Sequence, residues 1–382
     1  GREPDALKTF LSVGDALVAT VDDEAECLAH TTPGVIRYQD EELSLGAVTA
    51  VTTSHVARKL GFASSLTARL LARQAESGHH VSALGIFDQG FYDKLGYGTG
   101  SYENWITFDP ASLTVDRSFR APKRLTVTDY RAMHSAMLSR AHAHGNVSLL
   151  PADILVPEFT WTENSYGLGY FDGPDGTLSH FIWGSARAEH GPYTITWRAY
   201  RNGDELMELL ALIKSLGNQV SSFGMLEFGD IQLQDLLREP FRNRRITRKA
   251  EHENRSTTLA YWQLRILDLE ACLARTHLNT PTVQFNLELT DPVERYLDKG
   301  DNWHGIAGKY IVELGENSHA EEGQSGSLPT LKASVNAFSR LWFGVRPASS
   351  LAITDDLTAE PALLNSLDQS IRLPKPHLGW DF

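Results

Sequence analysis

The sequence is poor in cysteine and has no long apolar run. Only Cys27 and Cys272 are present among 382 residues, which excludes a disulfide framework and a cysteine-ligated zinc site. No apolar stretch approaches the 18 or so residues that a membrane-spanning helix needs. The first residues, GREPDALKTF, show no signal-peptide pattern. We therefore expect a cytoplasmic protein.

Motifs of several common enzyme classes are also missing. There is no G-x-S-x-G nucleophile elbow and no G-x-G-x-x-G after a first strand, which leaves a serine hydrolase and a Rossmann dehydrogenase unsupported. The histidines at His79-His80 and at His142 and His144 lack carboxylates at metal-ligand spacing. We expect no metal site.

Basic residues are outnumbered, 35 against 48 acidic ones, which gives a net charge of -13. A duplex nucleic-acid binder needs a basic face, so this balance argues against one. An acidic surface concentrates cationic amines, although solubility alone would explain the same charge. The length predicts two or three domains.

The stretch from Ala47 to Gly100 carries the most information. An apolar, β-rich run leads into a short basic loop, a helix, a second apolar strand and an aromatic turn. This order places unpaired N–H groups at a helix N-terminus, where a pyrophosphate can bind. Gly61 would let the backbone approach the ligand, and Arg58 would supply a cation. The alternative is an ordinary strand-to-helix turn with a surface arginine. The loop spans 58–63, the helix 64–77, the strand 81–87 and the turn 90–98.

The rest of the chain reads as two further units, beginning near Val115 and Thr258. In the second unit, Asp175-Gly176 predicts a hairpin and Asn202 caps an amphipathic helix. The basic stretch 242–249 is interpreted as a boundary. Expected helices cover 129–145, 205–219, 230–237, 265–271 and 334–344, expected strands 159–163, 167–171, 179–188, 193–200, 281–291 and 308–316, and an expected polar loop 316–327.

Three motifs together resemble the Eis-type (enhanced intracellular survival) acetyltransferases of the GNAT superfamily. They are R-x-x-G-x-A at Arg58–Ala63, G-x-Y-x-x-x-G-Y-G at Gly90–Gly98, and W-x-x-R-x-x-D at Trp262–Asp268. The resemblance covers essentially the whole chain and implies an α+β fold of tandem GNAT-like mixed-sheet domains followed by a sterol-carrier-like domain.

The implied domains follow from the same resemblance. A GNAT acetyltransferase domain would take residues 1–112, a second GNAT-like domain without cofactor 113–255, and a sterol-carrier-protein-like domain 256–382, with a tail that reaches the active site. The front end is short for a GNAT domain, because only about 15 residues precede the first strand, LVATV. In GNAT domains the front helices wall the pocket for the acceptor amine, so this pocket is the part of the resemblance that the short front end affects most.

The resemblance also implies roles for individual residues. Acetyl-CoA would be the co-substrate, and Tyr92 the general acid that protonates its thiolate. The C-terminal carboxylate of Phe382 matches the family's base, and Asp381 would attract cationic amines. Lys59 replaces a second arginine, and Phe87 stands where a small polar residue is usual. Cofactor contacts are expected from Val51, Thr52, Thr53, Val56, Arg58, Lys59, Gly61, Phe62 and Ala63.

The predicted function is direct transfer of an acetyl group to a primary amine of a cationic acceptor, an aminoglycoside, polyamine or lysine, within a ternary complex. The family assembles as hexamers, and no nucleic-acid or membrane partner is expected. Two alternatives stay open: a non-catalytic acyl-CoA or lipid-binding protein, and an oligomer that senses acyl-CoA. For single residues, Tyr92 and Tyr97 could simply pack the sheet edge, and Trp380–Phe382 could be a frayed tail.

Overall fold

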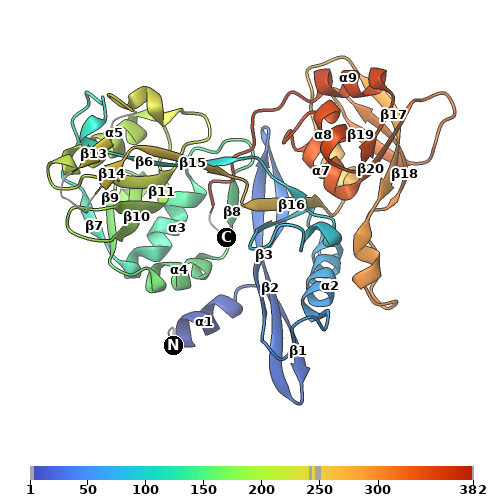
Figure 1. The fold of residues 1–382 in the computed structure, drawn as a ribbon, viewed down its shortest axis with the longest axis horizontal. Helices are drawn as coiled ribbons and strands as arrows, with labels where there is room; N and C mark the ends of the chain where they lie inside the picture. The colour runs from blue at the N-terminus through green and yellow to red at the C-terminus, as the bar shows by residue number, and fades with distance from the viewer. Residues whose placement is uncertain (1–3, 241–242, 246–250, 381–382) are drawn as a thin grey trace.

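The computed structural model of the chain describes residues 4–240, 243–245 and 251–380. Three sheets lie side by side along the long axis of the molecule (Figure 1). In Figure 1 the first sheet occupies the centre, the second lies to its left, and the third, built from the last part of the chain, lies to its right. The mixed α/β sheets agree with the predicted fold class.

The first sheet has the strand order β1-β2-β3-β4-β16-β5, and β8 pairs with β2 off this path. β1, β2 and β3 are antiparallel, whereas β3 and β4 run parallel. Helix α2 (Phe62–Glu76) makes the crossover between these two parallel strands, as a parallel pair requires. The strands are β1 (Asp15–Val21), β2 (Glu24–Tyr38), β3 (Glu41–Thr53), β4 (Val81–Gly85), β5 (Gly98–Thr99), β8 (Val147–Leu149) and β16 (Trp262–Ile266).

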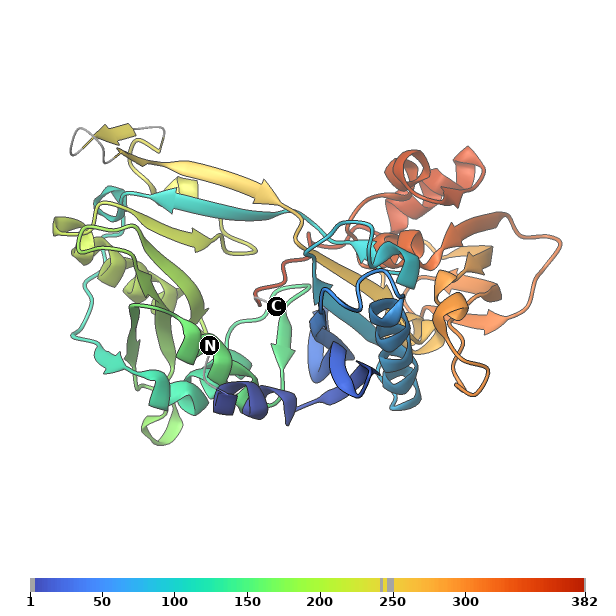
Figure 2. The same ribbon diagram turned by 60° about the horizontal axis from the view of Figure 1, so that its bottom comes forward.

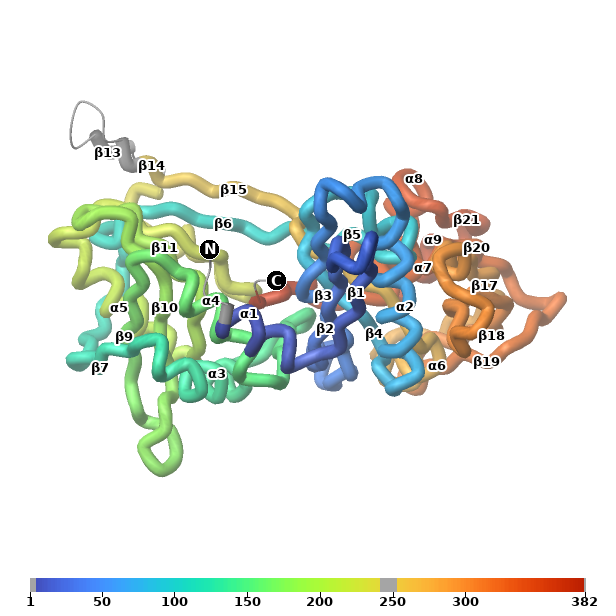
Figure 3. The backbone as a smooth tube through the Cα atoms, turned by 90° about the horizontal axis from the view of Figure 1, so that it is seen from below, coloured from blue at the N-terminus to red at the C-terminus, as the bar shows by residue number. Residues whose placement is uncertain are grey.

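The short front end holds one helix, α1 (Pro4–Leu11), before β1. α1 lies against α4 (Leu155–Trp161) of the second unit, as Figure 3 also shows from below. The extra front helices usual for a GNAT domain are therefore not found between residue 4 and β1. The second unit covers this side of the first sheet instead.

The second sheet has the order β15-β6-β12-β11-β10-β9-β7. Its parallel pair, β11 and β12, is joined by helix α5 (Gly203–Ser215), which repeats the β3–α2–β4 plan. Asn202 caps α5 by accepting the Glu205 N–H at 3.0 Å, and the turn at Pro174–Gly176 joins β9 to β10, so both predictions are confirmed. The strands are β6 (Glu103–Phe108), β7 (Lys123–Leu125), β9 (Ser165–Tyr170), β10 (His180–Ala186), β11 (Tyr193–Ala199), β12 (Phe223–Leu226) and β15 (Arg255–Leu259).

Two expectations in the second unit are wrong. Residues 159–163, expected as a strand, contain the end of helix α4. Leu155 and Phe159, spaced by four, are both fully buried there, so helical packing overrides the β propensity of the aromatic residues. The expected helix 129–145 stops early, since α3 covers only Tyr130–Leu138.

Further boundaries also differ from expectation. The expected helix 230–237 is a short 3-10 turn at Leu233–Leu236. Trp262–Ile266 is a strand whose five residues are all buried, so the expected helix 265–271 starts later, as α6 (Leu269–Ala274), capped by Asp268. The polar loop 316–327 contains strand β19 (His319–Glu322). Of the basic stretch 242–249, residues Asn243–Arg245 form β13, paired with β14 (Glu251–Glu253), and the remainder lies outside the described residues.

The third sheet has the order β19-β18-β17-β20-β21, in which only β17 and β20 are parallel. The strands expected near 281–291 and 308–316 and the helix expected at 334–344 are confirmed. Strands are β17 (Val283–Thr290), β18 (Gly308–Leu314), β19 (His319–Glu322), β20 (Thr330–Ser334) and β21 (Leu357–Thr358), and helices are α7 (Val335–Trp342), α8 (Ala348–Thr354) and α9 (Pro361–Ser370).

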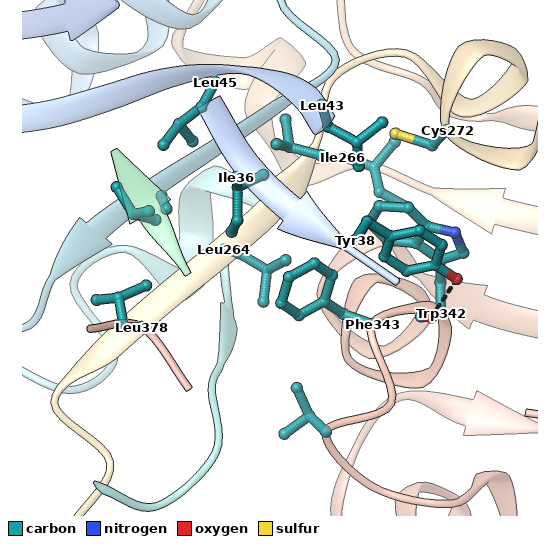
Figure 4. Packing of buried hydrophobic residues seen from close by; sticks show 14 of the residues in the cluster. Ile36, Tyr38, Leu43, Leu45, Leu264, Ile266, Cys272, Trp342, Phe343 and Leu378 are labelled. Atoms are coloured by element: carbon teal, nitrogen blue, oxygen red, sulfur yellow. Dashed lines mark hydrogen bonds between the residues drawn. The ribbon is translucent and has the colours of Figure 1, made fainter. Parts of the chain in front are cut away.

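The first sheet and the third unit share one hydrophobic core (Figure 4). Tyr38 at the end of β2 stacks on Trp342 with 4.4 Å between ring centroids, and its hydroxyl donates to the Trp342 carbonyl at 3.1 Å. Arg265 of β16 forms an ion pair at 2.5 Å with Asp291, and both side chains are fully buried. The two units are therefore joined by packing and by charge.

Strands cross the expected unit boundaries. β6 and β15 run together from the second unit toward the first (Figure 2), and β16 returns the chain to the first sheet beside β4. The first sheet is thus completed by residues far along the chain. No helix within the described residues is long and apolar enough to span a membrane.

The C-terminal segment docks between the first and second sheets. His377 N–H donates to the His144 carbonyl at 2.9 Å, and the Leu378 carbonyl accepts the Val147 N–H at 2.9 Å. Trp380 is buried, and its ring centroid lies 5.1 Å from that of Trp197. The docked tail is therefore confirmed as far as residue 380, while Asp381 and Phe382 lie outside the described residues.

Candidate active site

The two parallel strands of the first sheet separate at their C-terminal ends. β3 and β4 pair only from Leu45 with Val81 to Val48 with Leu84. Thr49 then forms a bulge, because the neighbouring β2 residues oppose Val48 and Ala50 and leave Thr49 without a partner. Beyond Val48, within the described residues, β3 has no strand on the side that faced β4. Its backbone groups there are available to a ligand.

The bulge is fixed by side-chain hydrogen bonds. The Thr49 hydroxyl lies 2.7 Å from Nδ1 of the buried His30 and 3.1 Å from the Thr32 hydroxyl. Burial lowers the pKa of His30 below its usual value, so its ring is neutral at neutral pH. A fixed bulge keeps the open strand in one conformation at this point.

A pocket of about 350 Å³ lies between the separated strand ends. Its walls come from the bulged part of β3, from the end of β4 and from the aromatic turn that follows. The lining residues are Val48, Thr49, Ala50, Val51, Gly85, Ile86, Phe87, Tyr92 and Tyr261.

The N-terminus of α2 follows the open strand of β3. Gly61 occupies the N-cap position with φ of 87°, no side chain caps the helix, and its first turn carries no acidic residue. A Cβ at Gly61 would meet nothing within 4 Å. Arg58 and Lys59 are exposed and form no ion pair with any described residue. Free N–H groups, the helix dipole and two cations together suit a diphosphate.

Tyr92 reaches the pocket from the aromatic turn. Tyr92 is almost fully buried. Its ring packs edge-on against those of Phe91 and Phe87, whose centroids lie 4.9 and 5.6 Å from its own. Tyr92 lines the pocket. Its hydroxyl has no hydrogen-bond partner among the described residues. Burial raises the pKa of Tyr92 well above its usual value. At neutral pH the phenol is therefore protonated and able to donate.

Tyr97 has the packing role that the sequence left open for both tyrosines. Its hydroxyl lies 2.7 Å from the Ser82 hydroxyl, which donates to the Gly46 carbonyl at 2.6 Å. Burial raises the pKa of Tyr97 as well, but its hydroxyl is already bonded within the sheet. Of the two, only Tyr92 lines the pocket, and only its hydroxyl lacks a hydrogen-bond partner among the described residues.

The other residues expected from the sequence fall into three places. Val51 lines the pocket, whereas Thr52 and Thr53 pair with Leu28 and Cys27 of β2. Val56 is exposed in the loop with Arg58, Lys59 and Gly61, and Phe62 and Ala63 form the first turn of α2. Phe87 is 68% exposed at the pocket. Asp381 and Phe382 lie outside the described residues.

The sequence did not single out six of the nine lining residues, among them Thr49 and Tyr261. Thr49 follows the regular alternation of its strand in sequence, so only the register reveals the bulge. Tyr261 precedes the Trp262 motif, and its carbonyl accepts the Ile86 N–H at 2.6 Å. This contact between segments 175 positions apart in sequence has no local signal.

A second, larger cavity of about 420 Å³ lies between the second sheet and the docked tail. Tyr261 lines this cavity as well as the pocket between β3 and β4. Its other walls come from β6, from β11 and the residue after it, from the segments after α3 and after β12, and from the tail. They include Trp105, Arg140, Trp197, Arg198, Tyr200, Phe228, Asp230, His377 and Trp380. The pocket and the cavity therefore share one lining residue.

Comparison with known proteins agrees with this geometry. Residues 2–100 match the acetyltransferase (GNAT) domain family. No curated protein matches the sequence significantly. Among solved structures, a conserved protein of Enterococcus faecalis V583 named a probable N-acyltransferase is 19% identical, with TM-score 0.77, over 100% of this chain and 93% of that one.

Two other solved structures have the same fold over nearly the whole chain. A GCN5-related N-acetyltransferase from Anabaena variabilis is 15% identical with TM-score 0.76, covering 99% of this chain and 93% of that one. Eis1 from Mycobacterium abscessus is 18% identical with TM-score 0.73, covering 98% and 92%. At these identities the likeness concerns the fold.

The chain is an acetyltransferase that carries a GNAT domain, and such domains use acetyl-CoA as co-substrate. The residues present fit that molecule. The uncapped α2 N-terminus with Arg58 and Lys59 suits a diphosphate, and the open edge of β3 offers amide-pairing groups to the extended pantetheine arm. The pocket that follows the open edge has room for an acyl group.

Proposed function

Because residues 2–100 form a GNAT acetyltransferase domain, we propose that the chain transfers an acetyl group from acetyl-CoA directly to a primary amine. One observation carries this proposal: Tyr92, whose phenol is protonated and has no hydrogen-bond partner among the described residues, lines the pocket where β3 and β4 separate. An amine and a thioester held together there react without a covalent enzyme intermediate.

Acetyl-CoA supplies the acetyl group as a thioester. The backbone N–H groups near Thr49 and Ala50 polarise the thioester carbonyl, while the loop of Arg58, Lys59 and Gly61 holds the diphosphate. The amine nitrogen forms a bond to the carbonyl carbon as the C–S bond breaks. Tyr92 donates its proton to the departing sulfur, and the proton that the amine loses passes through water to restore the phenol.

Desolvation supports this role for Tyr92. A free thiol has a pKa of about 8.5 and a phenol one of about 10, so in water the phenol would hold its proton. In the pocket, burial raises the pKa of Tyr92 and raises that of a desolvated thiol as well. The phenol therefore hydrogen-bonds to the sulfur as negative charge develops there, and its proton passes to the sulfur as the C–S bond breaks.

The Eis-type resemblance adds finer expectations to the proposal. It assigns a base or amine-orienting role to the Phe382 carboxylate, an attractive charge to Asp381, a sterol-carrier plan to the third unit, and a hexameric assembly. It also names cationic acceptors, namely aminoglycosides, polyamines and lysine. The docking of the tail up to Trp380 supports the roles of the two last residues.

The test is thiol release from acetyl-CoA with spermidine, an aminoglycoside or a lysine peptide, with the acetylated product identified by mass. The same assay is run on protein lacking Phe382. Amine-dependent release that collapses on this deletion supports both the transfer and the terminal carboxylate. Tight acetyl-CoA binding with no release for any amine would favour the non-catalytic binding protein instead.

A further inference from the structure

The cavity between the second sheet and the tail holds two arginines among aromatic walls. Arg198 extends from β11, and Arg140 follows helix α3. Trp197 and Trp380 pack on each other beside them, with centroids 5.1 Å apart. A cation surrounded by aromatic rings is an unusual lining for a site expected to receive polycations.

Arg140 is already engaged by the protein. It donates to the Ser148 hydroxyl at 3.1 Å and to the Val147 carbonyl at 2.6 Å, and also bonds to the Met137 carbonyl near the end of α3. These bonds hold the segment between α3 and β8 to which the tail docks. Its role is structural.

Arg198 is less fully engaged. Its single hydrogen bond among the described residues is to the Glu227 carbonyl at 3.1 Å, and the ring of Phe228 lies 4.4 Å from its guanidinium carbon. A guanidinium has five N–H donors, and the described residues leave most of those of Arg198 unused.

No described carboxylate lies within 4 Å of Arg198. The neighbouring Glu103 is held by an ion pair with His377 and by the Leu378 N–H at 2.7 Å. Asp230, the one carboxylate that lines the cavity in the described part of the chain, is exposed. Among the described residues Arg198 has a carboxylate only beyond contact distance, that of Glu103, and the planar carboxylate of a ligand would match its guanidinium fork.

Tyr261 links this cavity to the pocket between β3 and β4, because it lines both. We propose that the acceptor is a primary amine that also bears a carboxylate and an apolar or aromatic body, as an amino acid does, with the carboxylate bound by Arg198. This inference rests on the proposed function. Free lysine satisfies both this description and the resemblance, whereas a polyamine or an aminoglycoside has no anionic group.

Pairs of acceptors that differ only by a carboxylate measure what the carboxylate contributes. Phenylalanine is compared with 2-phenylethylamine, and lysine with cadaverine, by thiol release and product mass. For the unmodified protein we expect at least one acid to exceed its decarboxylated partner in kcat/KM by about 10-fold to 100-fold. Arg198→Gln should raise KM for that acid by a similar factor and leave the plain amine unchanged.

Two further variants control the experiment. Arg198→Lys, which keeps the charge without the fork, should retain part of the preference. Arg187→Gln removes an exposed arginine of the same unit, on the connection between β10 and β11, and should leave the preference intact.

Two results overturn the inference. One is amine acetylation with no preference for either acid, and the other is an equal loss on acid and amine in Arg198→Gln. Both leave the proposed function standing, because acetylation of amines still occurs. Absence of release with every acceptor would instead remove the proposed function and this inference with it.

Discussion

The backbone carbonyl of Tyr261 accepts a hydrogen bond from the N–H of Ile86 at 2.6 Å. This contact continues the pairing of β16 with β4 past the end of the sheet, at the point where β3 has already turned away. Tyr261 consequently lines both the pocket between β3 and β4 and the larger cavity beside the tail. A residue from the far end of the chain thus completes the site that the first hundred residues begin.

The glycine at the start of α2 is expected to matter for acetyl-CoA. Gly61→Ala places a Cβ where the protein leaves space and where a bound diphosphate would lie, at a backbone φ of 87°. We expect KM for acetyl-CoA to rise about tenfold or more, because charge-assisted hydrogen bonds to the backbone are lost. Steady-state kinetics with varied acetyl-CoA measures this.

Gly78→Ala is the matched control, since Gly78 follows the other end of the same helix with φ of 82° and equally open surroundings. Both substitutions carry a similar backbone strain of about 1 kcal/mol. Only the first should change KM. A similar rise in both variants would mean that strain in α2, and not the ligand, is responsible.

Acid should destabilise the protein through buried histidines. His144 Nδ1 accepts the Gln39 N–H at 3.1 Å, and Nε2 donates to the Phe343 carbonyl at 3.0 Å. Both nitrogens are used by the neutral ring, and burial lowers the pKa of His144 below 6.5. The unfolded chain therefore binds the extra proton first, and stability falls as the pH drops below about 6.5.

Urea unfolding at pH 7.5, 6.5 and 5.5 measures the slope of the free energy of unfolding against pH. His144→Gln should flatten it by up to about 1.4 kcal/mol per pH unit, whereas His55→Gln, at an exposed position, should not. An unchanged slope in the His144 variant would contradict the assignment. Other histidines whose pKa values burial also lowers contribute to the remaining dependence on pH, namely His30, His80, His134, His142 and His180.

The buried ion pair between Arg265 and Asp291 is expected to be important for stability. Asp291→Asn leaves a fully buried guanidinium without its counter-ion, which costs about 3–5 kcal/mol. Asp15→Asn breaks an exposed pair with Arg73 and should cost less than about 1 kcal/mol. Chemical denaturation of both variants makes the comparison, and equal losses would contradict the role given to burial.

Local features of this chain could be predicted because their causes are local. The α2 loop, the cap by Asn202, the hairpin at Asp175-Gly176 and the strands β10 and β11 all follow from turn chemistry or from strand-forming apolar and aromatic residues. The predicted Tyr92 lies in the pocket for the same reason, since the aromatic turn follows β4 directly.

Features set by tertiary contacts could not be predicted. Phe159 carries strand-like propensity but is buried on a helix, and Trp262–Ile266 is a strand because β4 and β5 enclose it. The bulge at Thr49 depends on the register with His30, and the cavity at Arg198 depends on a tail that arrives 180 residues later. None of these has a signal within its own segment.

The central claim is that the hydroxyl of Tyr92 promotes acetyl transfer in the pocket between β3 and β4. The most direct test is amine-dependent thiol release by Tyr92→Phe at saturating acetyl-CoA, with Tyr97→Phe as the control that removes an internal hydroxyl. We predict a fall in kcat of about 10²-fold to 10⁴-fold for Tyr92→Phe, with unchanged acetyl-CoA binding, and a small change for Tyr97→Phe. Full activity in Tyr92→Phe would contradict the account.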